Sequence, residues 1–284
     1  MTERVAVIGL GRMGRSIAQR LVKDGMAVIG WTRSGSASKE FPVAPSLQAA
    51  AADADVLILS LFDDHAVRSV LEQLASLDMT GRLLVETSTV SPNVVRDMEN
   101  SIEAAGGRII DAPISGGPEM VAAGTIGLYL GGADEDIARF MPLASRLSNR
   151  VLPVGPLGAG AAAKIVNNTA LAGAFHAIVD AIQLGHAMGL QLDTMLAFLK
   201  ESPATTPMFR ARIPKMTGED DTVGFTIEAV LKDNALFLQA AEAFGVDLPE
   251  LRHARQRLEA AIDADLGGQD PAALVRFVLR DKRD

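Results

Sequence analysis

The sequence has no cysteine, which excludes disulfides, thiol catalysis and cysteine-based metal sites. It also has no excess of basic residues. The net charge is -8, and no basic stripe is available to neutralise phosphates, so we expect no nucleic-acid partner. No segment approaches the roughly 18 uninterrupted apolar residues of a membrane span, and the first residues form a strand pattern instead of a signal sequence. We therefore expect a soluble, cytoplasmic protein without a membrane partner.

Histidine is scarce as well, because only 4 are present and none has the spacing of a metal ligand pair. We expect no metal site. What the chain has in quantity is apolar side chains: 48% of its 284 residues are hydrophobic. This content is enough for a large core, and the length suits one large domain or two ordinary ones.

The first half alternates short apolar runs with helical stretches. The runs are rich in Val, Ile and Leu without polar alternation, as in strands that are buried on both faces. Strands are predicted at 5–8, 27–31, 56–61, 83–87, 108–111, 126–131 and 151–154, and helices at 12–23, 46–52, 66–75, 93–105 and 134–147. This order predicts an α/β, doubly wound Rossmann domain, with a parallel sheet covered by helices on both faces.

After residue 155 no further convincing strand is present. A proline-free helix over 161–188 is apolar nearly all round, so it should be buried inside the protein or between subunits. Shorter helices are predicted at 192–200, 226–244, 251–264 and 272–279, with 208–212 in a loop that either lines the substrate pocket or is solvated. We predict a dinucleotide-binding domain over 1–157, joined by the long helix to an all-α domain over 158–284.

A glycine-rich turn follows the first predicted strand. It reads Gly9-Leu10-Gly11-Arg12-Met13-Gly14 and opens a helix, which is the context in which Gly-x-Gly-x-x-Gly binds a dinucleotide. Gly9 allows the tight turn, Gly11 lets the pyrophosphate approach the backbone, and Gly14 allows close helix packing. The alternative is an ordinary strand–helix turn that happens to be rich in glycine.

The end of the second predicted strand discriminates between the two nicotinamide cofactors. An acidic residue there would bind the ribose 2′-hydroxyl of NAD, but the chain reads Trp31-Thr32-Arg33-Ser34. Arg33 suits a 2′-phosphate, and Thr32 and Ser34 can donate hydrogen bonds to it. We therefore expect NADP (NADPH), with NAD as a possible second cofactor; the alternative is a solvated surface arginine.

Four motifs in this order and spacing resemble the β-hydroxyacid dehydrogenase family. This 6-phosphogluconate dehydrogenase-like group includes 3-hydroxyisobutyrate dehydrogenase, tartronate semialdehyde reductase and glyoxylate/succinic semialdehyde reductases. The motifs are the turn at 9–14, Asp111-Ala112-Pro113-Ile114-Ser115-Gly116-Gly117-Pro118, Gly158-Ala159-Gly160 with Lys164 and Asn168, and Lys232-Asp233. The resemblance covers nearly the whole chain and implies a homodimer or homotetramer built through the helical domain.

The resemblance also implies roles for matching residues. Lys164 would be the catalytic acid/base, and Asn168, one helical turn further, would orient the substrate. The substrate carboxylate would bind to Ser115, Gly116 and Gly117. Lys232 would reach the cofactor or the substrate, with Asp233 supporting the local structure. The nicotinamide and its ribose would be lined by Leu61, Phe62 and Thr89.

Lysine suits reduction of an aldehyde because the alkoxide left by hydride transfer must be protonated. The ordinary lysine pKa lies near about 10.4, and apolar neighbours in the sequence would lower it. The alternative for Lys164 is an amine that reaches solvent from a helix surface.

Two other functions stay open. One is an imine reductase-like enzyme, although imine reductases usually carry aspartate or tyrosine in place of this lysine. The other is a non-catalytic dinucleotide-binding module. The physiological substrate and the preferred direction are open too.

Overall fold

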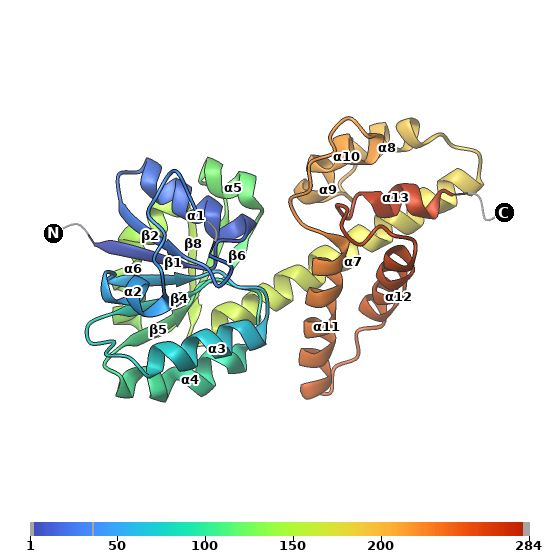
Figure 1. The fold of residues 1–284 in the computed structure, drawn as a ribbon. Helices are drawn as coiled ribbons and strands as arrows, with labels where there is room; N and C mark the ends of the chain where they lie inside the picture. Colours follow the sequence, from blue (N-terminus) through green and yellow to red (C-terminus); the bar gives the residue numbers. More distant parts are fainter. Residues whose placement is uncertain (1–2, 36, 281–284) are drawn as a thin grey trace. The chain divides into compact units, whose positions relative to one another are not determined.

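Figure 1 shows the computed structural model of the chain, which describes residues 3–35 and 37–280. The chain divides into two compact units, Met1–Ile165 and Val166–Asp284. The first unit has two hydrophobic core clusters, and the second has one of its own. The predicted α/β class, with a Rossmann-like sheet, a long helix and a helical C-terminal part, is confirmed.

The first unit is built on an eight-stranded sheet with the order β2-β1-β3-β4-β5-β7-β6, in which β8 pairs with β7. The strands are β1 (Arg4–Ile8), β2 (Ala27–Trp31), β3 (Val56–Leu59), β4 (Leu83–Glu86), β5 (Arg108–Asp111), β6 (Ile114–Ser115), β7 (Gly127–Gly131) and β8 (Arg150–Gly155). The first five strands run parallel, so their carboxyl ends meet at one edge of the sheet.

Alternate residues of the central strands enter different cores, because successive side chains of a strand point to opposite faces. Val5 and Val7 belong to one core, and Ala6 and Ile8 to the other. The helices of the first core are α1 (Arg12–Lys23), α5 (Pro118–Ala123) and α6 (Asp134–Leu147); those of the second are α2 (Leu47–Ala52), α3 (Asp64–Ala75) and α4 (Pro92–Ala104). Figure 1 shows α3 and α4 side by side on one face of the sheet, with α1 on the other.

The end of the sheet differs from the prediction. β7 pairs antiparallel with both β5 and β6, so the sheet is mixed and not wholly parallel. The chain can reverse here because Gly124 ends α5 with a φ of 71°, in the left-handed region that glycine adopts readily. Neither β6 nor α5 was predicted. β6 has only two residues, too few to show a strand period, and α5 is a short helix between two turn glycines, Gly117 and Gly124.

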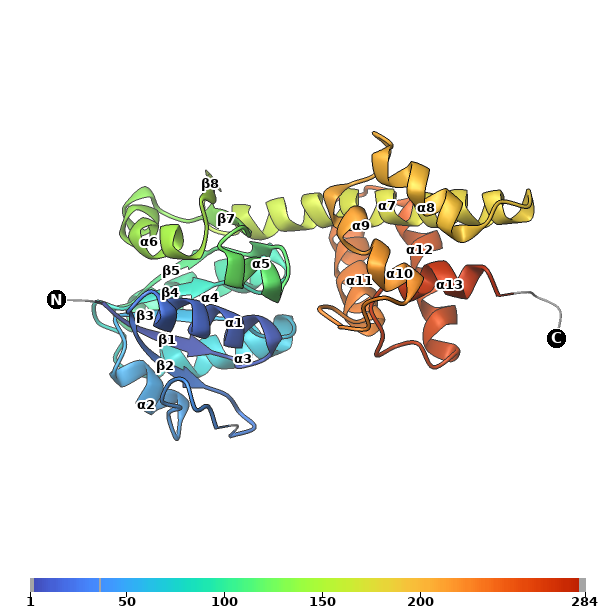
Figure 2. The same cartoon turned by 90° about the horizontal axis from the view of Figure 1, so that it is seen from above.

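The second unit is helical throughout its described part, which extends to residue 280. After the long helix α7 (Ala159–Ala187) follow α8 (Leu192–Glu201), α9 (Pro207–Ala211), α10 (Ile213–Thr217), α11 (Ile227–Ala243), α12 (Pro249–Asp263) and α13 (Ala273–Val278). Figures 1 and 2 show α9 to α13 gathered around the C-terminal part of α7.

The predicted loop at 208–212 is wrong, because α9 occupies most of it. Thr206 caps this helix by accepting a hydrogen bond from the Phe209 N–H, Pro207 stands in its first turn, and Phe209 is fully buried. A helix of five residues, closely followed by another, shows too little periodicity to be read from sequence.

The long helix α7 begins in the first unit and continues in the second. Within the described residues α7 is the one helix that is long and apolar enough to cross a membrane, by length and composition only. The core helix of a soluble protein can have the same length and composition. Only 28% of its most apolar window is buried within the chain. Val166, Leu184 and Met188 are 71%, 63% and 73% exposed. A single chain therefore does not bury this helix, and burial between subunits stays a prediction.

Candidate active site

The turn between β1 and α1 needs glycine at two positions because backbone atoms meet there. Gly9 has a φ of 98°, and a Cβ on it would overlap the carbonyl oxygen of Ser60. A Cβ on Gly14 would overlap the carbonyl oxygen of Gly9. These contacts place α1 directly against the strand ends, which is the packing expected of a dinucleotide-binding turn.

Gly11 has the opposite environment, since no heavy atom other than those of Gly11 and its two chain neighbours lies within 4 Å of the position a Cβ would take. It is the N-cap of α1, no side chain caps this end, and the first turn contains no acidic residue. Backbone N–H groups and the positive end of a helix dipole at an open position suit a phosphate group. Leu10 is buried, Met13 is half-buried and Arg12 is exposed. The turn therefore fits a dinucleotide pyrophosphate.

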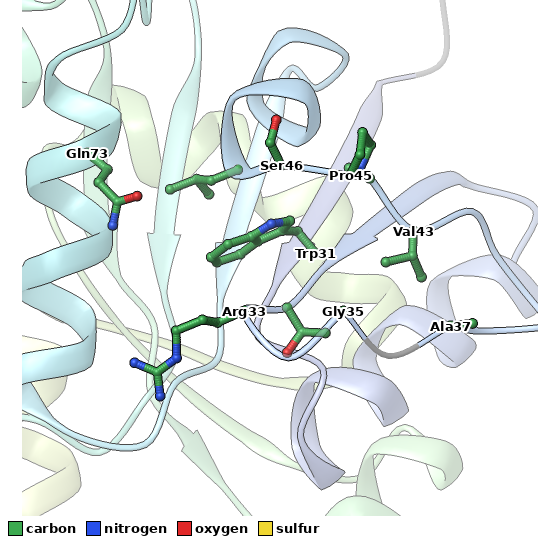
Figure 3. A pocket seen from close by; sticks show the side chains of 11 residues that line it. Trp31, Arg33, Gly35, Ala37, Val43, Pro45, Ser46 and Gln73 are labelled. Atoms are coloured by element: carbon green, nitrogen blue, oxygen red, sulfur yellow. The ribbon is translucent and has the colours of Figure 1, made fainter.

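A pocket of about 550 Å³ lies at the end of β2. Figure 3 shows the Trp31 indole within its lining, the guanidinium of Arg33 extending from the strand end, and Gln73 of α3 on another side. Thr32 also lines it, with Oγ1 3.4 Å from the Oγ of Ser34. An indole ring and a guanidinium beside one pocket suit a nucleotide, because the ring can contact an aromatic base and the guanidinium can contact a phosphate on the ribose. Sequence reasoning placed Arg33 here but missed Trp31 and Gln73.

The loops after β3 and β4 are joined by a hydrogen bond to Ser88, and a buried acid holds Ser88 in turn. The Leu61 N–H donates to Ser88 Oγ over 2.8 Å, and the Ser88 N–H donates to Glu86 Oε1, also over 2.8 Å. Glu86 is the last residue of β4. The two loops carry the predicted cofactor residues Leu61 and Thr89, both half-buried, and Phe62, which is 61% exposed.

Glu86 itself is fully buried, and its Oε2 has no hydrogen-bond partner among the described residues. The pKa of Glu86 is raised to about 7, mainly by burial and to a smaller extent by the nearby Asp111 and Asp64, while the hydrogen bonds with Ser88 oppose the change. Sequence reasoning missed this residue, although an acid that ends an otherwise apolar strand was a usable signal.

Lys164 lies in the second turn of α7 and is only 7% exposed. The start of this helix is held by Asp111, the last residue of β5. Its Oδ1 accepts the Gly158 N–H over 2.7 Å, and its Oδ2 accepts the Ala161 N–H over 2.6 Å. Burial raises the pKa of Asp111 to about 6, while these hydrogen bonds and the charge of Arg96 oppose the change. Sequence reasoning counted Asp111 within a motif but gave it no role.

The predicted substrate turn follows directly after β6. Ser115 ends this strand, Gly116 has a φ of 141°, and Gly117 is the N-cap of α5 without a side-chain capping bond. The exposed Glu119 folds back over the turn, because its carboxylate oxygens lie where a Cβ on Gly117 would be. An incoming carboxylate therefore requires Glu119 to turn away.

Asn168 and Lys232 lie in the second unit, whereas all other predicted site residues lie in the first. Asn168 Oδ1 accepts a hydrogen bond from Asn167 Nδ2 over 3.0 Å. Lys232 Nζ lies 2.6 Å from Oδ1 of the buried Asp233. Across residues 3–35 and 37–280 no group of three or more side chains could hold a metal ion.

Two family models match the chain in succession. The NAD-binding domain of 6-phosphogluconate dehydrogenase matches residues 4–155, which is more than half of the chain. A model described as the NAD-binding part of NADP-dependent 3-hydroxyisobutyrate dehydrogenase matches residues 158–278. The two matches together cover almost the whole chain.

Known proteins resemble the chain over nearly its full length. The 2-(hydroxymethyl)glutarate dehydrogenase of Eubacterium barkeri is 30% identical over 96% of this chain and 94% of its own. Glyoxylate/succinic semialdehyde reductase 1 of Arabidopsis thaliana is 26% identical over 96% and 98%. The structure of Mycobacterium tuberculosis 3-hydroxyisobutyrate dehydrogenase with L-serine is 28% identical, covers 98% of this chain and 99% of its own, and superposes with a TM-score of 0.85. The chain thus belongs to the β-hydroxyacid dehydrogenase family and is an NAD(P)-dependent oxidoreductase.

Proposed function

We propose that the chain is an NADP-dependent enzyme that interconverts a small β-hydroxyacid and its semialdehyde, with Lys164 as general acid/base. The observation that carries this proposal is the burial of Lys164 in a helix that starts at the carboxyl end of β5. The open glycine turn follows β1, which runs parallel to β5 through β3 and β4. The helix that carries the proton donor therefore begins at the sheet edge where the dinucleotide turn lies.

The reduced nicotinamide supplies the hydride when it is bound. Lys164 then donates a proton to the carbonyl oxygen of the substrate, and in the oxidative direction its neutral amine accepts the hydroxyl proton. The ammonium charge also stabilises the alkoxide as it forms. Asn168, four residues further along α7, orients the substrate, and Lys232 reaches the cofactor or the substrate.

The preference for NADP over NAD is assigned to the end of β2. Arg33 pairs with the 2′-phosphate, and Thr32 and Ser34 donate hydrogen bonds to it. The 550 Å³ pocket beside Arg33 supports this assignment because Trp31 offers an apolar ring surface to the adenine. No acid stands at this strand end to bind a ribose 2′-hydroxyl, although NADH remains a usable cofactor.

The substrate class is assigned to small carboxylic aldehydes and their hydroxyacids. Ser115, Gly116 and Gly117 bind the carboxylate through the hydroxyl and the backbone N–H groups. Glu119 rotates off Gly117 when the substrate enters. The names of two relatives contain small carboxylic acids, 2-(hydroxymethyl)glutarate and succinic semialdehyde, which supports the same class for this chain.

We assign residues 1–157 to NADP binding and 158–284 to substrate binding and to the contact of a homodimer or homotetramer. The exposed Leu184 and Met188 of α7 support the second assignment, because an oligomer would remove these apolar side chains from water. We place the protein in the cytoplasm.

A substrate panel tests the proposal. NADPH and NADH oxidation is followed with small semialdehydes, neutral aldehydes of equal size and cyclic imines. We expect turnover of the semialdehydes, with NADPH used better than NADH. Faster reduction of cyclic imines would favour an imine reductase, and cofactor binding without turnover of any compound would favour a non-catalytic module.

A further inference from the structure

Asp111 is a fully buried acid for which the proposed chemistry has no use. Its two carboxylate oxygens accept the N–H groups of Gly158 and Ala161, over 2.7 Å and 2.6 Å. Both N–H groups stand at the start of α7, where a helix leaves its first donors without partners inside the helix. Asp111 therefore caps this helix from a strand that lies 47 residues earlier in the chain.

The first turn of α7 also packs closely on the sheet at two glycines, Gly160 of the helix and Gly131 of β7. A Cβ on Gly160 would overlap the carbonyl oxygen of Tyr129 and would lie 2.8 Å from Asp111 Oδ2. A Cβ on Gly131 would lie 2.8 Å from the backbone nitrogen of Gly160. The turn thus cannot slide or rotate without losing contacts to β5 or β7.

The chain just before the helix is held as well. Arg96 Nε of α4 donates to the carbonyl oxygen of Leu157 over 3.0 Å. The charge of Arg96 also favours the ionised form of Asp111. The charge of Asp111 in turn raises the pKa of Glu86, its register neighbour on β4. An ionised Asp111 can accept both N–H groups, since each oxygen of a carboxylate is an acceptor.

Lys164 follows Ala161 by three residues, a spacing that places both on one side of the helix. A change in the depth or rotation of the first turn therefore displaces the Lys164 side chain. We propose that Asp111 is a positioning residue, which holds the first turn of α7 so that the Lys164 amine stands where proton transfer occurs. This inference rests on the proposed role of Lys164. The close packing of the first turn on the sheet also explains why residue 160 is a glycine.

The variant Asp111→Asn tests the role directly. Asparagine keeps the shape but offers one oxygen and an NH₂ group, which would point its hydrogens at one of the two N–H donors. We expect kcat to fall about 10- to 100-fold, as for a small misplacement of a reacting group, with the Kd of NADPH within about two-fold of the parent. Amide hydrogen exchange in 159–164 should become at least about 10-fold faster.

Asp136→Asn is the matched control. Asp136 is also a buried acid of the first unit, but it lies on α6 and accepts a hydrogen bond from Arg108 Nε over 2.9 Å. The substitution should lower the melting temperature while kcat stays within about two-fold. An equal fall of kcat in both variants would mean that general destabilisation, and not the position of Lys164, explains the loss.

A second pair of variants leaves the carboxylate intact. Gly160→Ala should reproduce the kcat loss, because its methyl group would push the first turn away from Tyr129. Gly173→Ala lies in the same helix with open space around it, so kcat should stay within about two-fold. Full activity of Gly160→Ala would contradict the proposal even if Asp111→Asn does not fold.

A spectroscopic readout separates this inference from the proposed reaction. The chain has seven lysines, so ¹³Cε-labelled lysine gives few NMR signals, and Lys164→Gln identifies that of Lys164. We expect Asp111→Asn and Gly160→Ala to move this signal and the midpoint of its titration, with the other signals unchanged. An unmoved Lys164 signal would overturn the positioning role. If the unaltered protein reduces no compound of the panel, the proposed function fails there, while the Lys164 signal and the amide exchange still decide the inference.

Discussion

Replacing Glu86 by glutamine should make the protein more stable at alkaline pH than at acid pH, relative to the parent. Burial raises the pKa of Glu86 from 4.5 to about 7. Below pH 4.5 the acid is protonated in the folded and the unfolded chain, so it has no effect. As the pH rises toward 7, the unfolded chain releases this proton and the folded one retains it, so stability falls. Well above pH 7 the folded chain must ionise the buried Glu86 carboxyl, and the full free-energy cost of this ionisation lowers the stability.

The size of the effect follows from the pKa difference. At about 1.36 kcal/mol per pKa unit, the cost at high pH is about 3 kcal/mol, and about 2–3 kcal/mol of it develops between pH 5 and pH 8. The glutamine amide adds a cost of about 1–3 kcal/mol for an unsatisfied buried group, but this cost does not depend on pH. The difference between variant and parent should therefore grow with pH.

Thermal unfolding of both proteins from pH 5 to pH 8 measures this growth. At about 2–4 °C per kcal/mol, the difference in melting temperature between Glu86→Gln and the parent should shift by about 5–10 °C in favour of the variant from pH 5 to pH 8. Glu72→Gln, at an exposed acid on α3, is the control. Its melting temperature should change with pH in the same way as that of the parent. Parallel curves for Glu86→Gln as well would refute the reasoning and mean that the buried acid does not hold a proton near neutral pH.

Other perturbations address the proposed site. Lys164→Ala should lower kcat by about 10²- to 10⁴-fold with unchanged NADPH binding; activity within a few-fold of the parent would exclude the acid/base role. Arg33→Ala should weaken NADPH binding by about 1.5–3 kcal/mol and NADH binding little in calorimetric titrations, and equal losses would show that Arg33 does not contact the 2′-phosphate. Glu119→Gln should lower KM for carboxylic aldehydes but not for neutral ones, because it removes a negative charge from the turn at Gly117; an unchanged ratio would place the carboxylate elsewhere. Light scattering should give at least a dimer mass, since α7 exposes Leu184 and Met188, and a monomer at micromolar concentration would contradict the proposed assembly.

Much of the fold could be predicted because the strong patterns are local. The five parallel strands are buried apolar runs, and each begins and ends within two residues of its prediction. α1 and α6 have the predicted bounds, as expected for helices with one clear apolar face. The enzyme class and the family, which followed from short motifs in order, are confirmed.

The features that the sequence did not predict have physical causes of their own. The antiparallel course of β7 depends on a chain reversal after a six-residue helix, which leaves no periodic signal. The segment at 208–212 looked like a basic loop, but burial of Phe209 and the cap from Thr206 make it helical. The apolar character of α7 was read correctly, yet most of its apolar window is not covered within one chain.

The sequence by itself determined which residues are suited to the chemistry, because a glycine turn after a strand, an arginine without a neighbouring acid and a lysine in an apolar helix are local features. Only the tertiary structure decided what holds them in place. Asp111 meets Gly158 across 47 residues, and Leu61 meets Ser88 across 27. Contacts of this kind depend on which strands become neighbours in the sheet, and no spacing within a single segment specifies them.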